Sequence, residues 1–122
     1  MNNPVVWFEI YVQDMERARS FYETMLGVTL SKLAGTEVEM WSFPGGPEGG
    51  GASGSLVKMP GCPSGGNSVL VYFSCADCAV EAARAAKAGG RVEREKFPIG
   101  QYGHIALVVD TEGNMIGLHS MQ

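Results

Sequence analysis

The feature that most constrains this chain is an approximate internal repeat with an offset of 63 residues. Residues 7–30 align with residues 70–93 by matched pattern rather than by matched letters. In this alignment Asp14 meets Asp77, each between an apolar strand and a helix. A repeat of this length is a whole supersecondary module, and we expect the functional site to lie between the two modules.

Each module reads as a strand, a helix and then three strands. In the first module, apolar and β-branched residues predict strands at 5–12, 28–33, 38–43 and about 54–59, with a helix between Asp14 and Gly27. In the second module, strands are predicted at 68–75, 91–96, 104–109 and 115–120, with a helix at 77–88. The Gly/Pro-rich segment 44–51 predicts a flap or a plain surface loop. We therefore expect one domain, residues 1–122, with module one at about 4–59, a linker at about 60–67 and module two at about 68–122.

Composition excludes several kinds of partner. The net charge is −4 and no basic tract is present, which argues against binding to nucleic acid or to a membrane surface. No apolar run approaches the ~18 residues that a transmembrane helix needs. The three cysteines are an odd number, which argues against a disulfide framework and for a reducing compartment. We expect a cytoplasmic protein whose partner is a small molecule.

Two motifs carry a family resemblance. V-x-D-M-x-x-A-x-x-F-Y-x-x-x-L-G at 12–27, followed by D-T-E-G-N-M-I-G-L-H at 110–119, resembles the vicinal oxygen chelate superfamily of glyoxalases, bleomycin-resistance proteins and extradiol dioxygenases. The resemblance covers nearly the whole chain. It implies an α+β fold of two tandem βαβββ modules, whose strands form a curled mixed sheet, or cup, with the helices on its convex face. It also implies a homodimer.

Strand alternation predicts which side chains would line the cup, because successive residues of a strand point to opposite faces. The residues opposite to the predicted helix-facing sets are Trp7, Glu9, Tyr11, Trp41, Leu70, Tyr72, His104 and His119. Aromatic walls with few polar groups suit an aromatic, amphipathic or cationic ligand. An acid on such a wall can also serve as a general base.

Metal-dependent proteins that resemble this chain take one ligand from each of four strands. The matching positions here are Trp7, Gly54, Leu70 and Gly117, none of which offers a side-chain donor to a divalent cation. The sequence therefore predicts that no metal and no other cofactor is bound. A non-standard site of Glu9, His104 and His119 stays open, because two imidazoles and a carboxylate are a plausible ligand set.

The pair Cys75-x-x-Cys78 has a redox or zinc interpretation and a structural one. A zinc site needs a second pair of ligands, and Cys62 is the only other cysteine. Cys75 also has the helix-facing parity of its strand. The sequence therefore favours structural cysteines.

These observations leave several functional hypotheses. The first is a metal-independent binding protein that sequesters a small molecule, as metal-free bleomycin-resistance proteins do. The second is a metal-independent isomerase or lyase in which Glu9 is the general base and His104 its partner. A metal-dependent glyoxalase or dioxygenase with non-standard ligands, and a domain whose cup has become a protein contact, are further alternatives. Whether the protein is an enzyme therefore remains open from sequence.

Overall fold

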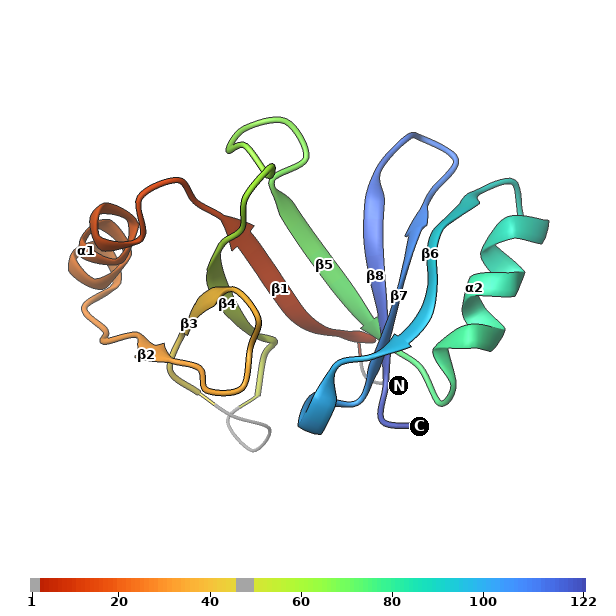
Figure 1. Ribbon diagram of the computed structural model, residues 1–122, viewed down its shortest axis with the longest axis horizontal. Coiled ribbons are helices and arrows are strands. Elements are labelled where there is room, and N and C mark those ends of the chain that lie inside the picture. Colours follow the sequence, from red (N-terminus) through yellow and green to blue (C-terminus); the bar gives the residue numbers. More distant parts are fainter. Residues whose placement is uncertain (1–2, 46–49) are drawn as a thin grey trace. The chain divides into compact units, whose positions relative to one another are not determined.

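The computed structural model describes residues 3–45 and 50–122 (Figure 1). The chain divides into two compact units, one formed by residues 7–69 and the other by residues 1–6 together with 70–122. The predicted α+β order of two βαβββ modules is confirmed. The flap or loop predicted at 44–51 includes residues 46–49, which lie outside the described residues.

The elements of the first module follow the predicted order, but the strand predicted at 28–33 is only two residues long. They are β1 (Val5–Tyr11), α1 (Met15–Leu26), β2 (Ser31–Lys32), β3 (Glu39–Ser42) and β4 (Ser53–Lys58). The strand order is β2-β3-β4-β1, in which β1 and β4 are parallel. Helix α1 begins where the Asp14 carboxylate accepts a hydrogen bond from the Arg17 backbone N–H at 3.0 Å. It ends at Gly27, whose φ of 68° is the left-handed conformation that glycine adopts at low cost.

The second module repeats this order. It consists of β5 (Val69–Ser74), α2 (Cys78–Lys87), β6 (Arg91–Pro98), β7 (His104–Val109) and β8 (Met115–Ser120), in the strand order β5-β8-β7-β6. Asp77, which the repeat aligns with Asp14, caps α2 by accepting a hydrogen bond from the Ala79 backbone N–H at 3.1 Å. A short 3₁₀ turn, η1 (Gly100–Tyr102), was not predicted.

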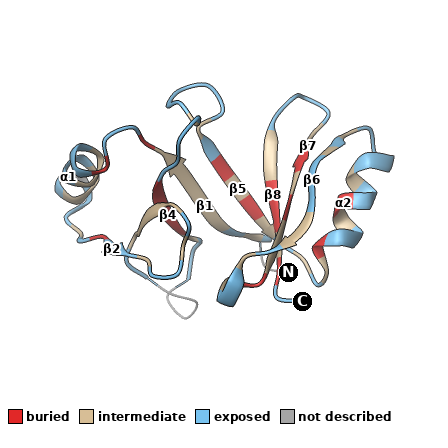
Figure 2. Ribbon diagram, in the orientation of Figure 1, coloured by how far each residue is buried: buried red, intermediate tan, exposed pale blue. Residues whose placement is uncertain are grey.

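Each helix packs on one face of the strands of its own module, and this determines which strand residues remain on the other face. Under α1 the buried core is Val12, Met15, Leu30 and Leu56. Under α2 it is Cys78, Ala82, Ala106, Val108 and Leu118. Figure 2 shows buried stretches in red on α2, β7 and β8. Within the described residues, no helix is long and apolar enough to cross a membrane.

Candidate functional site

Three side chains of β1 form one row of the predicted lining. Ile10 and Val12 pack into the core under α1, so Trp7, Glu9 and Tyr11 lie on the opposite face, as strand alternation predicted. The Glu9 carboxylate accepts a hydrogen bond from Trp7 Nε1 at 3.1 Å and another from the Tyr11 hydroxyl at 2.7 Å. The two aromatic side chains therefore hold the carboxylate in one orientation. All three residues are half-buried.

Strand β4 adds a residue that the sequence did not single out. The register pairs Trp7 with Ser53 and Glu9 with Ser55, so both serines share the face of Glu9. Ser55 is fully buried, and its hydroxyl has no hydrogen-bond partner among the described residues. The only sequence signal for this hydroxyl was the alternation Ser-Gly-Ser at 53–55.

The prediction that Trp41 points away from the helix is wrong. Its indole packs against the core under α1, and the guanidinium carbon of Arg19 on α1 lies 3.5 Å from the ring centroid. Trp41 Nε1 donates to the Glu39 carboxylate at 2.9 Å. Trp41 therefore belongs to the helix side of its sheet, away from the face that carries Trp7.

The predicted face of His104 is also wrong. Ala106 and Val108 of the same strand are buried against α2, and the register of β7 on β8 is continuous, so His104 points to the helix side as well. There it lies near Asp77, whose carboxylate contacts Lys96 Nζ at 2.8 Å. The hydrogen bond from Lys96, then the one from the Ala79 backbone, lowers the pKa of Asp77, and the nearby His104 contributes in the same direction.

The remaining predicted residues lie on the face of the second module's strands that is opposite α2. Leu70 and Tyr72 are only 4% and 5% exposed, so they contribute to the wall rather than to open surface. Ile116 and Leu118 pack under α2, which leaves His119 on the opposite face. The His119 ring nitrogen Nε2 lies 2.6 Å from the Tyr102 carbonyl oxygen, and this contact fixes the orientation of the imidazole.

The residues at the four family positions do not fit a metal ion. Trp7 and Leu70 have no metal-binding atom, and Gly54 faces the other side of its sheet: a Cβ there would meet the Phe8 ring at 2.5 Å. At Gly117 a Cβ would meet the Tyr72 ring at 2.2 Å, so that ring fills the space that a ligand side chain would need. The donor set itself therefore argues against the family's metal site.

The non-standard metal site is contradicted by the two histidines. His104 points toward α2, whereas His119 lies on the opposite face of the same sheet. Two imidazoles on opposite faces cannot share an ion with short ligand bonds. Consistently, the described residues contain no group of three or more His, Cys, Asp or Glu side chains that could hold a metal.

The two neighbouring cysteines lie on the helix side, as predicted. Cys78 is fully buried at the start of α2, and Cys75 packs against the same cluster. Burial, followed by the nearby Glu81 carboxylate, raises the pKa of Cys75 to about 11. Because the thiolate is the reactive form, this environment suits a structural role.

We expect only one of the three thiols to react quickly with a thiol reagent in the native protein. Cys62 is partly exposed, whereas Cys78 is buried and roughly one Cys75 thiol in a thousand is ionised at pH 8. A time course with a chromogenic disulfide, with and without denaturant, measures this. Rapid labelling of Cys75 in the folded state, located by mass spectrometry, would contradict the structural interpretation.

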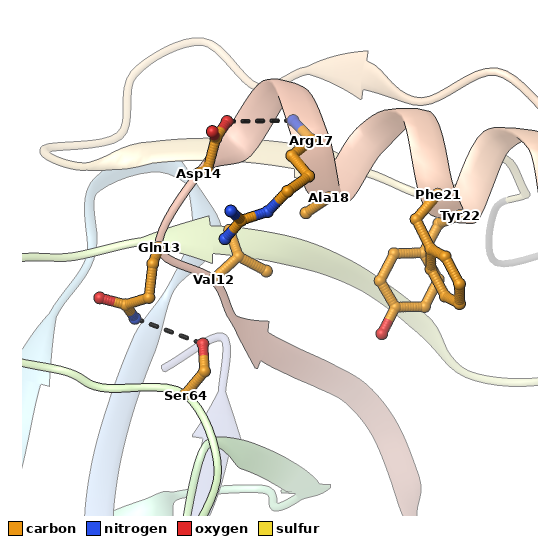
Figure 3. A pocket seen from close by; sticks show the side chains of 8 residues that line it. All are labelled: Val12, Gln13, Asp14, Arg17, Ala18, Phe21, Tyr22 and Ser64. Carbon is orange, nitrogen blue, oxygen red and sulfur yellow. Dashed lines mark hydrogen bonds between the residues drawn. The ribbon is translucent and has the colours of Figure 1, made fainter.

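A pocket of about 340 Å³ lies where α1 begins, lined by Val12, Gln13, Asp14, Arg17, Ala18, Phe21, Tyr22 and Ser64 (Figure 3). Gln13 Nε2 donates to the Cys62 carbonyl at 2.9 Å and to the Ser64 hydroxyl at 3.3 Å, which ties the linker to the end of β1. Asp14 is the helix cap. None of the residues predicted for the functional site lines this pocket. Two of its polar side chains, Gln13 and Asp14, stabilise the linker and the start of helix α1.

Comparison with known proteins agrees with this fold. The family model of the Glyoxalase/Bleomycin resistance protein/Dioxygenase superfamily matches residues 5–118. The CFP32 proteins of Mycobacterium bovis and Mycobacterium tuberculosis, whose names carry a provisional glyoxylase assignment, are each 34% identical over 112 residues. The match covers 89% of this chain and 41% of theirs, so the chain spans less than half the length of these curated relatives.

Solved structures show the same fold at low identity. A methylmalonyl-CoA epimerase of Streptomyces coelicolor, in complex with 2-nitronate-propionyl-CoA, has a TM-score of 0.69 at 18% identity, covering 97% of this chain and 96% of that one. Hypothetical protein BH1468 from Bacillus halodurans has a TM-score of 0.72 at 13% identity, covering 97% and 94%. Because the family model matches nearly the whole chain, this protein belongs to the Glyoxalase/Bleomycin resistance protein/Dioxygenase superfamily.

Proposed function

We propose that this protein binds a small aromatic, amphipathic or cationic molecule, without a metal ion, on the face of β1 and β4 that points away from α1. The observation that carries the proposal is the Glu9 carboxylate, which Trp7 and Tyr11 hold in one orientation from either side. A fixed negative charge between two aromatic rings suits a cation, since ring faces attract positive charge and the carboxylate pairs with it.

Metal independence is supported by the chemistry of the residues present. Neither Trp7 nor its β4 neighbour Ser53 is a ligand that divalent cations commonly use in proteins, and Gly117 is covered by the Tyr72 ring. We therefore propose that ligand binding on this face depends on hydrogen bonding, stacking and charge.

A metal-independent isomerase or lyase is the second candidate function. In this reading Glu9 is the general base, and the 2.7 Å hydrogen bond from Tyr11 aims its carboxylate. The sequence-based partner His104 points toward α2 and His119 is tied to Tyr102, so Tyr11 replaces them as the residue that positions the base. A proton transfer at a carbon next to a carbonyl is the reaction class that such a base serves.

Replacing Trp7 by Ala should weaken binding of an aromatic cation by roughly tenfold or more. A stacked aromatic contributes ~0.5–1.5 kcal/mol beyond its buried area, and ~1.4 kcal/mol corresponds to one decade in Kd. Thermal-shift titration of a panel of aromatic amines measures this, because a ligand of the folded state raises stability as its concentration exceeds Kd. Trp41→Ala is the matched control, since Trp41 packs under α1. An equal loss of affinity in both variants would count against the site.

We also propose that the protein is a cytoplasmic homodimer, as expected from the sequence. An exposed sheet edge carries unpaired backbone groups, and a small domain is protected when a second chain covers that edge. Two-fold dimers are the commonest assemblies of this kind. Sedimentation equilibrium should give twice the chain mass of 13.0 kDa. A mass of one chain at every concentration up to the solubility limit would refute the dimer.

A further inference from the structure

Strand β6 lies at the edge of the sheet and carries Arg94, whose side chain packs on the Phe97 ring. Two irregularities in the pairing of β6 with β7 account for this contact. The pairing of β6 with β7 shifts register between Val92 and Arg94, and again between Arg94 and Phe97. In a regular strand, residues three apart point to opposite faces, but bulges change this alternation. As a result Arg94 and Phe97 share one face, and the Arg94 guanidinium carbon lies 3.6 Å from the centroid of the Phe97 ring.

The strand register shows which side chains lie next to Arg94 and Phe97 on the same face of the sheet. Arg94 pairs with Leu107, and Phe97 pairs with Ile105. On the next strand, Leu107 pairs with Gly117 and Ile105 with His119. Paired residues point to the same side of a sheet, and Val92, Ala106, Val108 and Leu118 occupy the side under α2. The opposite side therefore presents a guanidinium at the edge and two half-buried aliphatic side chains next to it.

The stacked guanidinium is available for an anion. Its flat face lies on Phe97, which leaves the N–H groups at its edge, and this fork matches a carboxylate in a bidentate pair. Among residues 3–45 and 50–122, Arg94 forms no ion pair, whereas Arg91 of the same strand is bonded to Glu93 at 2.6 Å. A cation held in place beside an apolar surface, without an acid of its own, is complementary to an organic anion.

We propose that this face of the second unit binds an organic carboxylate: Arg94 pairs with the carboxylate, and Ile105 and Leu107 pack against its apolar body. Neighbouring strands lie ~4.8 Å apart, so the distance from β6 to β8 predicts a body about 10 Å long. The inference concerns a different unit from Glu9 and is independent of the function proposed above.

The test uses octanoate below its micellar concentration, with octanamide as the neutral probe of the same length. In a heteronuclear NMR titration, octanoate should shift the backbone amides of Arg94, Ile105 and Leu107. Octanamide should bind at least tenfold more weakly. Arg94→Gln should weaken octanoate binding at least tenfold, and Arg94→Lys should restore only part of it, because an ammonium keeps the charge but loses the planar fork.

Arg91→Gln is the matched control, because it removes an exposed, already paired arginine from the same strand. It should change the octanoate Kd by less than twofold. The proposal is overturned if octanoate does not bind, if its shifts map to other strands, if octanamide binds equally well, or if Arg94→Gln and Arg91→Gln have the same effect. Since Arg94 is exposed, its variants should keep the wild-type spectrum outside β6 and β7, and a globally changed spectrum would show that Arg94 serves the fold instead.

Discussion

Replacing Glu9 by Gln should weaken binding of an aromatic cation about 10- to 100-fold, while a neutral aromatic of the same shape should bind as before. A hydrogen bond to a charged group contributes about 1.5–3 kcal/mol, and ~1.4 kcal/mol is one decade in Kd. Calorimetric titration with phenethylammonium and with phenethyl alcohol measures both ligands. The substitution keeps the local bonding pattern, because the Gln amide oxygen can accept from Trp7 Nε1 while its NH₂ donates to the Tyr11 hydroxyl.

The chain offers a matched control for this variant. Glu39 accepts a hydrogen bond from Trp41 Nε1 at 2.9 Å, which is the same kind of pair on the helix side of the same sheet. Glu39→Gln should leave both affinities unchanged. If a substrate that is turned over is found, the two candidate functions separate: a general base predicts that Glu9→Gln abolishes turnover while affinity survives. Equal affinities for the cation in wild type and Glu9→Gln, with no turnover in either, would contradict both.

Replacing Gly117 by Ala should lower the free energy of unfolding by about 1–3 kcal/mol, the usual cost of overpacking a well-packed site. The added Cβ would lie 2.2 Å from a ring carbon of Tyr72, a side chain that is only 5% exposed and cannot move freely. Urea denaturation measures the loss. For the same reason, Gly117→Glu should not create a metal site, because the ring occupies the space of the new side chain.

The double-mutant comparison isolates this contact. In a Tyr72→Ala background the same Gly117→Ala change should cost little, since the ring that it meets is gone. An equal cost in both backgrounds would mean that the ring does not determine the need for glycine. Stoichiometric nickel or zinc in purified Gly117→Glu would contradict the steric argument directly.

The features that the sequence predicted well are those with local physical signals. Asp14 and Asp77 cap their helices because a short acidic side chain reaches the free backbone N–H groups of the first turn. The face of β1 was predicted correctly because Glu9 and Tyr11 alternate with the aliphatic Ile10 and Val12, which pack inward.

The faces of β3 and β7 could not be predicted in this way. Strand β7 is a nearly continuous apolar run, so alternation gives no signal, and the larger Ile105 and Leu107 were expected to pack under the helix. Instead Ala106 and Val108 are buried there, because α2 is rich in alanine and lies close to the strand. His104 and Trp41 both point to the helix of their own module, so the opposite face assigned to each from strand alternation was wrong.

One further error arises from an insertion that a fixed offset cannot describe. Ser42 pairs with Ser55 and Ile105 with His119, so the offset between the modules grows by one residue across the hairpin loops. Gly54 consequently points to the helix side, whereas Gly117 points away from it. The register shifts around Arg94 likewise depend on pairing with a distant strand, and the local sequence carries no sign of them.

The most direct test of the proposed site uses the only two tryptophans, which lie on opposite faces of one sheet. Phenethylammonium should change the tryptophan emission of the wild-type protein. The change should persist in Trp41→Phe, where only Trp7 emits, and vanish in Trp7→Phe, where only the indole stacked under Arg19 emits. A signal that survives in Trp7→Phe and disappears in Trp41→Phe would place the ligand on the helix side of the sheet and contradict the binding site at Glu9.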